Sequence, residues 1–157
     1  MAIQYLVGDA TLPVGRGAKV IVHVCNDIGK WGRGFVLAVS RRWSEPERVY
    51  KSAFKTGEAP RLGDVQFVPV VPGVTVANLI GQHGVASRHT STPPVRYDAI
   101  RQGLQAVAER ATSAGASVHM PRIGCGLAGG EWTLVEQIVE STLVRAGVPV
   151  FVYDLSA

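Results

Sequence analysis

The chain has 157 residues, 46% of them hydrophobic, and a formal net charge of +4. This length and composition suit one globular domain spanning residues 1–157, and they exclude a disordered or fibrous chain. No run approaches the ~18 consecutive apolar residues that a membrane span needs, and the N-terminus lacks a signal-peptide pattern. We therefore expect a cytoplasmic protein without a membrane partner. The small, dispersed positive charge gives no reason to expect specific nucleic-acid binding.

Six short apolar runs with many β-branched residues predict strands. In chain order they cover residues 3–7, 19–25, 64–70, 74–80, 117–123 and 148–153. The third and fourth runs are separated by the turn signal Val71-Pro72-Gly73, which predicts an antiparallel hairpin. The second and fifth runs are the most apolar, as is typical of central strands in a parallel sheet.

Helical spacing of apolar residues fills most of the connections between these runs. Residues 95–113 and 131–146 predict long helices, ended by Gly115 and Gly147, whereas 35–43 and 46–56 predict shorter ones. Residues 11–17 are ambiguous between a helical turn and a loop. Strands alternating with helices predict an α/β sandwich with a mixed sheet of about six strands.

Two glycine-rich loops follow the two central strands. The first runs from Asn26 to Gly34, and the second contains Gly124-Cys125-Gly126-Leu127-Ala128-Gly129-Gly130. Glycine lets backbone N–H groups approach a ligand, and each loop leads into a predicted helix. In α/β folds, ligands bind at the carboxyl ends of strands. A cleft for a phosphate-bearing ligand is therefore expected between the loops.

Several other chemistries fit the sequence poorly. Gly124-x-Gly126-x-x-Gly129 matches the dinucleotide fingerprint, but it lies on the fifth strand rather than the first. No glycine loop leads into Gly-Lys-Ser/Thr, and no nucleophile elbow is present. The four histidines His23, His83, His89 and His119 show no metal-ligand spacing, so no metal is expected. We expect Cys25 and Cys125 to be small buried thiols of a protein in a reducing compartment. A reactive cysteine or a disulfide are the alternatives.

Three motifs in order resemble the macrodomain family. They are Val7-Gly8-Asp9-Ala10-Thr11, then Val22-His23-Val24-Cys25-Asn26 with Lys30-Trp31-Gly32-Arg33-Gly34-Phe35, and then Met120-Pro121-Arg122-Ile123-Gly124-Cys125-Gly126-Leu127-Ala128-Gly129-Gly130-Glu131-Trp132. The last is similar to the branch that contains terminal ADP-ribose protein glycohydrolase, the chromatin-remodeller macrodomain and the yeast ADP-ribose-1″-phosphate phosphatase. The resemblance implies a three-layer α/β/α domain that binds ADP-ribose, with mono-ADP-ribosylated proteins as partners and no further cofactor.

The resemblance also implies roles for individual residues. Asp9 and Ala10 would contact the adenine, and Tyr153 and Asp154 would flank the adenosine. The diphosphate and distal ribose would lie between the two loops, against Asn26, Gly32, Arg33, Gly34 and Phe35 on one side and Arg122, Gly124, Cys125, Gly126, Leu127, Ala128 and Gly129 on the other.

The chain departs from one relative where catalysis is concerned. The glycohydrolase has an aspartate where this chain has Ala128, and a lysine in the region that here reads Ile80-Gly81-Gln82-His83-Gly84. That pair is absent, so His83 is the favoured general acid or base, with Gln82 orienting water or ribose. His23 and Asn26 are the second choice, and a water activated by the substrate's own phosphate is the third.

Two functions of different classes follow. The first is a hydrolase that removes mono-ADP-ribose from acidic side chains, with ADP-ribose-1″-phosphate hydrolysis as a close variant. The second is a non-catalytic reader of ADP-ribosylated proteins, for which Ala128 and the missing lysine argue.

Overall fold

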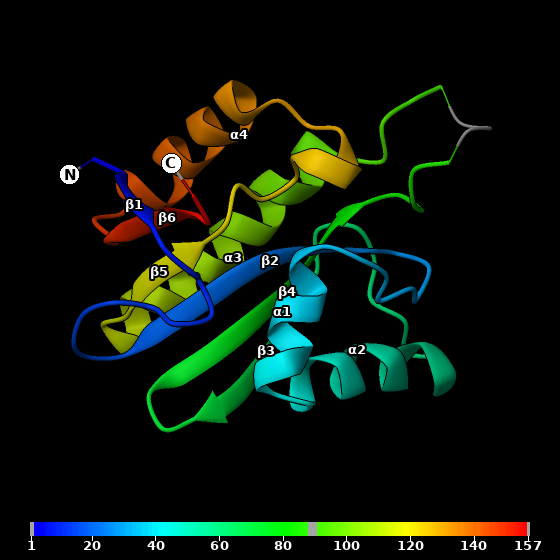
Figure 1. Ribbon diagram of the computed structural model, residues 1–157, viewed down its shortest axis with the longest axis horizontal. Coiled ribbons are helices and arrows are strands. Elements are labelled where there is room, and N and C mark those ends of the chain that lie inside the picture. Colours follow the sequence, from blue (N-terminus) through cyan, green and yellow to red (C-terminus); the bar gives the residue numbers. More distant parts are fainter. Residues whose placement is uncertain (1, 88–90, 157) are drawn as a thin grey trace.

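A six-stranded mixed sheet forms the centre of the protein (Figure 1). The computed structural model describes residues 2–87 and 91–156. The strand order is β1-β6-β5-β2-β4-β3, so β5 and β2 are the central strands, as predicted. The bounds are β1 Gln4–Val7, β2 Lys19–Asn26, β3 Val65–Val71, β4 Val74–Gln82, β5 Ser117–Met120 and β6 Val150–Asp154. All neighbours pair in parallel except β3 and β4, which form the expected antiparallel hairpin.

Helices cover both faces of the sheet and complete an α/β/α sandwich (Figure 1). The helical segments are α1 Phe35–Arg42, α2 Glu45–Lys55, α3 Tyr97–Ala114, the 3₁₀ turn η1 Gly126–Ala128, and α4 Trp132–Val139, which continues as the π-helical turn η2 Glu140–Val144. Two separate apolar cores result. The larger one joins α3 and α4 to one face, and the smaller one joins α1 and α2 to the other.

The observed element boundaries differ from the predicted ones for identifiable reasons. Strand β5 ends at Met120, three residues early, and Pro121, which follows it, has no N–H to donate to a neighbouring strand. Strand β4 runs on to Gln82, which also bridges to Val95, so α3 begins two residues later than predicted. The ambiguous residues 11–17 form a loop without a helix.

The parallel strands bring their carboxyl ends to one edge of the sheet. The register pairs Cys25 with Ile80 but Asn26 with Gln82, so the β2–β4 ladder shifts by one residue at its end. The connections after β2 cover one face, whereas α3 and α4 cover the other, so the chain changes faces beside β2 and β5. Ligands of open α/β sheets bind at such a switch point.

Within the described residues, no helix is long and apolar enough to cross a membrane.

Candidate functional site

Two adjoining hollows lie where β2 and β5 end, and together we call them the loop groove. The outer hollow, of about 250 Å³, is lined by the first glycine loop, Gln82 and the segment around Val85. The inner hollow, of about 320 Å³, is lined by Phe35 and the second glycine loop. The two share lining residues, among them Arg33 and Leu127. The structure therefore places the two glycine loops on opposite walls of one groove, where the sequence predicted a cleft.

Buried side chains hold the first loop in shape. Asn26 Oδ1 accepts hydrogen bonds from the N–H groups of Ile28 and Lys30, both at 3.1 Å, and from the hydroxyl of Tyr50 at 2.7 Å. Its Nδ2 donates to the Lys30 carbonyl. Trp31, buried below the loop, donates from Nε1 to the Ser40 hydroxyl at 2.7 Å. This network gives Asn26 a structural role in the loop, because both ends of its amide are occupied.

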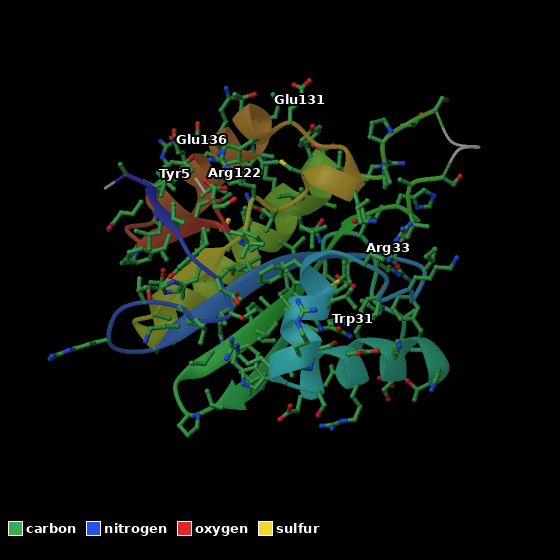
Figure 2. The ribbon with its side chains drawn as sticks, viewed as in Figure 1. Tyr5, Trp31, Arg33, Arg122, Glu131 and Glu136 are labelled. Carbon is green, nitrogen blue, oxygen red and sulfur yellow. The ribbon has the colours of Figure 1, made fainter. Side chains whose placement is uncertain are left out.

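The first loop delivers the N-terminus of α1 to the groove. Gly34 precedes the helix with φ +88°, no side chain caps the helix, and its first turn contains no acidic residue. The free N–H groups and the positive end of the helix dipole therefore favour an anion at this point. Arg33, which is exposed and labelled in Figure 2, lines both hollows and adds a positive charge.

The glycines of the second loop divide into two kinds. A Cβ on Gly124 would lie 2.8 Å from Ile100 Cδ1, and one on Gly129 would lie 2.8 Å from Pro93 Cβ. A Cβ on Gly130 would come within 2.3 Å of the Gly124 carbonyl oxygen. Gly126, with φ +67°, has nothing within 4 Å of that position. Three glycines thus allow close packing, and Gly126 alone of these four leaves open space.

His23 lies in the floor of the groove but is almost fully buried. Its Nε2 donates to Asn78 Oδ1 at 2.6 Å, because Asn78 Nδ2 already donates to the Pro46 carbonyl. Burial lowers the pKa of His23 to about 4, so the ring is neutral at pH 7. The ring packs against Trp31 and Phe35. This geometry favours a structural role for His23 over proton transfer.

His83 lies beside the outer hollow and pairs with Asp27. Its Nδ1 donates to Asp27 Oδ2 at 2.7 Å, while Asp27 Oδ1 accepts from the Gly84 N–H at 2.8 Å. Partial burial raises the pKa of Asp27, but these hydrogen bonds outweigh it, and the net pKa lies below the usual value. An ionised Asp27 therefore favours the His83 tautomer that has its proton on Nδ1, and in that tautomer Nε2 is the atom with a free lone pair. Gln82, the preceding residue, lines both hollows.

Asp27 was not among the predicted site residues. A polar residue directly after a central strand was an available signal, but its pairing with His83 depends on the β2–β4 register. Val85 and Ala86, which line the outer hollow, were not predicted either, and Lys30, which also lines it, was named only as part of the family motif.

The residues expected near adenosine line neither hollow of the groove. Asp9 Oδ1 accepts from the Thr11 N–H and hydroxyl at 2.8 and 2.7 Å, while Ala10 is buried. Asp9 instead lines a shallow hollow near the end of α1. The hydroxyl of buried Tyr153 accepts from the Val14 N–H at 3.0 Å, so Tyr153 anchors the loop after β1.

The beginning of the second loop is fixed by an ion pair. Arg122 donates to both carboxylate oxygens of Asp154, at 2.8 and 3.0 Å, and this hydrogen bonding lowers the pKa of Asp154. The guanidinium also lies 5.3 Å from the ring centroids of Tyr5 and Trp132. Tyr5 and Arg122 are labelled in Figure 2. Arg122 lines the inner hollow, and its contact with a ligand stays a prediction.

Neither cysteine is suited to nucleophilic catalysis. Both are free thiols, and burial raises the pKa of Cys25 and of Cys125. In the part of the chain that the structure describes, no group of three or more His, Cys, Asp or Glu side chains could hold a metal ion. His89 lies outside the described residues.

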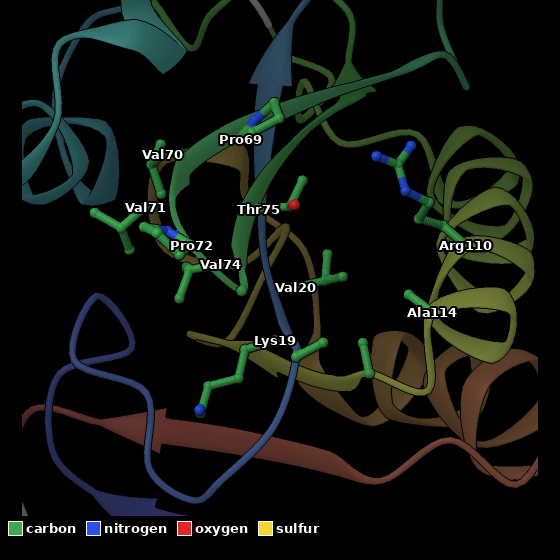
Figure 3. Close-up of a pocket in the computed structure, with 13 residues that line it drawn as sticks. Lys19, Val20, Pro69, Val70, Val71, Pro72, Val74, Thr75, Arg110 and Ala114 are labelled. Carbon is green, nitrogen blue, oxygen red and sulfur yellow. The ribbon is translucent and has the colours of Figure 1, made fainter.

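Another hollow, of about 440 Å³, lies at the opposite edge of the sheet (Figure 3). It is formed by the turn of the β3–β4 hairpin, the start of β2 at Lys19, and Arg110 and Ala114 of α3. The Lys19 ammonium donates to the Gly17 carbonyl, and Arg110 lies over the Phe67 ring. Neither glycine-rich loop lines it, so the loop groove is the better candidate site.

Known structures identify the fold class. A protein of unknown function from Bacteroides thetaiotaomicron shares 55% identity and a TM-score of 0.95, covering 99% of both chains. A macrodomain protein from Streptomyces coelicolor shares 53% identity and a TM-score of 0.85, covering 97% of this chain and 98% of that one. No family model matches the chain. The chain belongs to the macrodomain family.

Curated relatives agree with this assignment. The chain is 33% identical to mouse chromodomain-helicase-DNA-binding protein 1-like over 97% of its own length, but it spans only 18% of that relative. It is 23% identical to bovine ADP-ribose glycohydrolase OARD1, covering 98% of this chain and 91% of that protein. The fold also matches Thermosipho africanus DarTG, solved in complex with ADP-ribose, at 21% identity and a TM-score of 0.67, covering 85% of this chain and 37% of that one.

Proposed function

We propose that the protein binds ADP-ribose in the loop groove. The observation that carries this proposal is the uncapped N-terminus of α1 facing a second wall of backbone around the open glycine Gly126. Backbone N–H groups, a helix N-terminus and Arg33 suit the two negative charges of a diphosphate. The names of two matched macrodomain proteins, one a glycohydrolase of ADP-ribose and one solved with it, support this ligand.

We further propose that the protein hydrolyses mono-ADP-ribose esters of acidic side chains. Water would add across the ester bond, which yields free ADP-ribose, the protein carboxylate and a proton. His83 Nε2 would accept the proton of the attacking water, and Asp27 would keep His83 in the tautomer that leaves Nε2 free. Gln82 would orient the water or the distal ribose from between the two hollows.

The proposed pair of His83 and Asp27 takes the place of an aspartate that the chain lacks. Ala128 is buried where the resembling glycohydrolase carries an aspartate, so the second loop offers no carboxylate there. Asp27 and His83 supply a carboxylate and a base from the neighbouring strand ends instead.

The test measures ADP-ribose release from an auto-modified protein substrate. We expect release by the wild-type chain, a fall of about 100-fold in kcat for His83→Ala, and a fall of at least tenfold for Asp27→Asn. An asparagine amide would donate to Nδ1 and so move the ring proton onto Nε2. Calorimetry with ADP-ribose is the control, and both variants should bind with wild-type affinity.

Each contrary outcome has a distinct meaning. Wild-type turnover with an unchanged His83→Ala rate would remove His83 from catalysis and leave a water activated by the substrate's phosphate. Release of inorganic phosphate from ADP-ribose-1″-phosphate, without ester hydrolysis, would indicate a phosphatase.

A reader of ADP-ribosylated proteins is the second candidate function. Ala128 favours it, and so does the Asn26 amide, whose oxygen and nitrogen both make hydrogen bonds within the protein, because both deplete the groove of reactive side chains. Tight ADP-ribose binding together with no turnover of ester or phosphate substrates would establish the reader and reject the hydrolase.

A further inference from the structure

The positive charge of this protein is concentrated in one layer of the fold. Residues 30–61 contain eight of the 16 Lys and Arg residues and three of the 12 Asp and Glu residues, a local net charge of +5. The rest of the chain has a net charge of −1. These residues form the end of the first loop, α1, α2 and the segment after α2. The modest net charge of +4 therefore hides a strongly basic layer.

A hollow of about 500 Å³ on α2 gathers part of this charge. Arg48, Lys51 and Lys55 line it together with the hydroxyls of Ser44 and Ser52. Its one carboxylate, Glu47, accepts hydrogen bonds from the Lys51 ammonium at 2.5 Å and the Ser40 hydroxyl at 2.8 Å, and the Lys51 contact lowers the pKa of Glu47. Within the described residues, Arg48 and Lys55 have no such acidic partner. The hollow therefore carries uncompensated positive charge.

This hollow is connected to the loop groove by the end of α2. The ring of Phe54 lies where it would be 3.0 Å from a Cβ on Gly29, so the end of α2 backs the first loop. Lys55 follows Phe54, and exposed Lys30 follows Gly29 and lines the outer hollow. The α2 hollow and the outer hollow of the groove thus each carry a lysine that adjoins the Phe54–Gly29 contact.

We propose that the α2 hollow docks an acidic stretch of the ADP-ribosylated acceptor protein. This inference rests on the proposed function and extends it to the polypeptide on either side of the modified residue. Arg48, Lys51 and Lys55 follow one helix face over about 10 Å. Carboxylates at alternate positions of an extended peptide recur about every 7 Å, so two of them span the hollow.

The aromatic side chains of this layer favour a peptide over a nucleic acid. Trp31 and Tyr50 are buried and their rings contact each other, while Phe35, Trp43 and Phe54 are partly buried and pack against the same core. These rings face the core, so they offer no platform on which bases would stack.

The first experiment neutralises two cations on this face. Arg48→Gln/Lys55→Gln should raise KM for the auto-modified protein substrate by threefold to tenfold, with unchanged kcat and unchanged ADP-ribose affinity. The matched control, Arg16→Gln/Arg145→Gln, removes the same charge from exposed positions outside this layer and should leave KM unchanged. Equal KM changes in the two variants would overturn the proposal.

The second experiment needs no turnover, so it separates this proposal from the hydrolase assignment. Fluorescence anisotropy would measure binding of a labelled glutamate-rich peptide and of a single-stranded oligonucleotide of equal charge, in low salt. We expect the peptide to bind the wild type and the control, and to bind Arg48→Gln/Lys55→Gln at least threefold more weakly. Tighter binding of the oligonucleotide through the same two residues would identify a nucleic-acid surface and reject the acidic peptide.

Discussion

The two glycine-rich loops line opposite walls of one groove, but their glycines differ in what surrounds them. In the first loop, Gly32 and Gly34 have positive φ, and a Cβ on either would meet nothing closer than 3.8 Å. In the second loop, Gly124, Gly129 and Gly130 accommodate neighbouring atoms, and Gly126 leaves open space. The first loop is held by side chains below it, namely Asn26, Trp31 and His23. The second is held by the Arg122–Asp154 ion pair at its start and by close packing at its glycines. The two loops are therefore alike in glycine content but are held in shape in different ways.

The largest expected effect breaks the packing of the second loop. Gly130→Ala would place a Cβ 2.3 Å from the Gly124 carbonyl oxygen, a contact that only a backbone shift relieves. We expect a loss of about 4 kcal/mol in the free energy of unfolding, measured by urea denaturation. Gly8→Ala is the control, since its Cβ would meet Tyr153 at an ordinary 3.6 Å. Equal stability of the two variants would contradict the packing role.

Lowering the pH should destabilise the protein through His23, whose ring supports the first loop. The pKa of His23 is about 4 in the folded protein and about 6.5 when exposed, so below pH 6.5 the unfolded chain binds a proton that the folded chain refuses. Stability therefore falls as the pH drops from 6.5 to 4, by about 3 kcal/mol from this residue. His119, with a pKa of about 4, adds a loss of the same sign.

Urea denaturation at pH 7 and pH 4 measures how much of this loss of stability comes from His23. His23→Gln should lose less stability between the two pH values than the wild type, because the contribution of His23 is gone while those of His119 and of the carboxylates with lowered pKa remain. Parallel losses in the two proteins would show that His23 is not the titrating group.

The last prediction concerns Gly126. Its substitution should have the smallest effect on stability of these variants and a large effect on ligand binding. Gly126→Val puts a branched side chain into open groove space, and we expect ADP-ribose affinity to fall at least 100-fold by calorimetry. Gly115→Val is the matched control, because Gly115 has a similar φ of +63°, equally open surroundings and a remote position after α3. Both variants carry a similar backbone strain of about 1–3 kcal/mol. Unchanged affinity in Gly126→Val would remove the ligand from this loop.

The sequence alone determined the order and type of the main elements. Six strands and four helices lie where hydrophobic periodicity placed them, and Val71-Pro72-Gly73 makes the predicted hairpin turn, because these signals are local. The sequence also predicted that the two glycine-rich loops follow the central strands. The exact ends of elements were predicted less well, and β4, for example, continues to Gln82, which pairs with Val95.

Only the tertiary structure decided what the individual site residues contact. The register of β2 on β4 sets Asp27 beside His83, although 55 residues separate them in the chain. Burial turned His23 into a neutral floor residue, and a local hydrogen-bond network used up the Asn26 amide. Whether a glycine of the second loop packs or stays open depends on Ile100, Pro93 and its own distant neighbours. The contacts of His83, of His23 and of the packed glycines Gly124 and Gly129 join residues remote in sequence, so no local pattern encodes them.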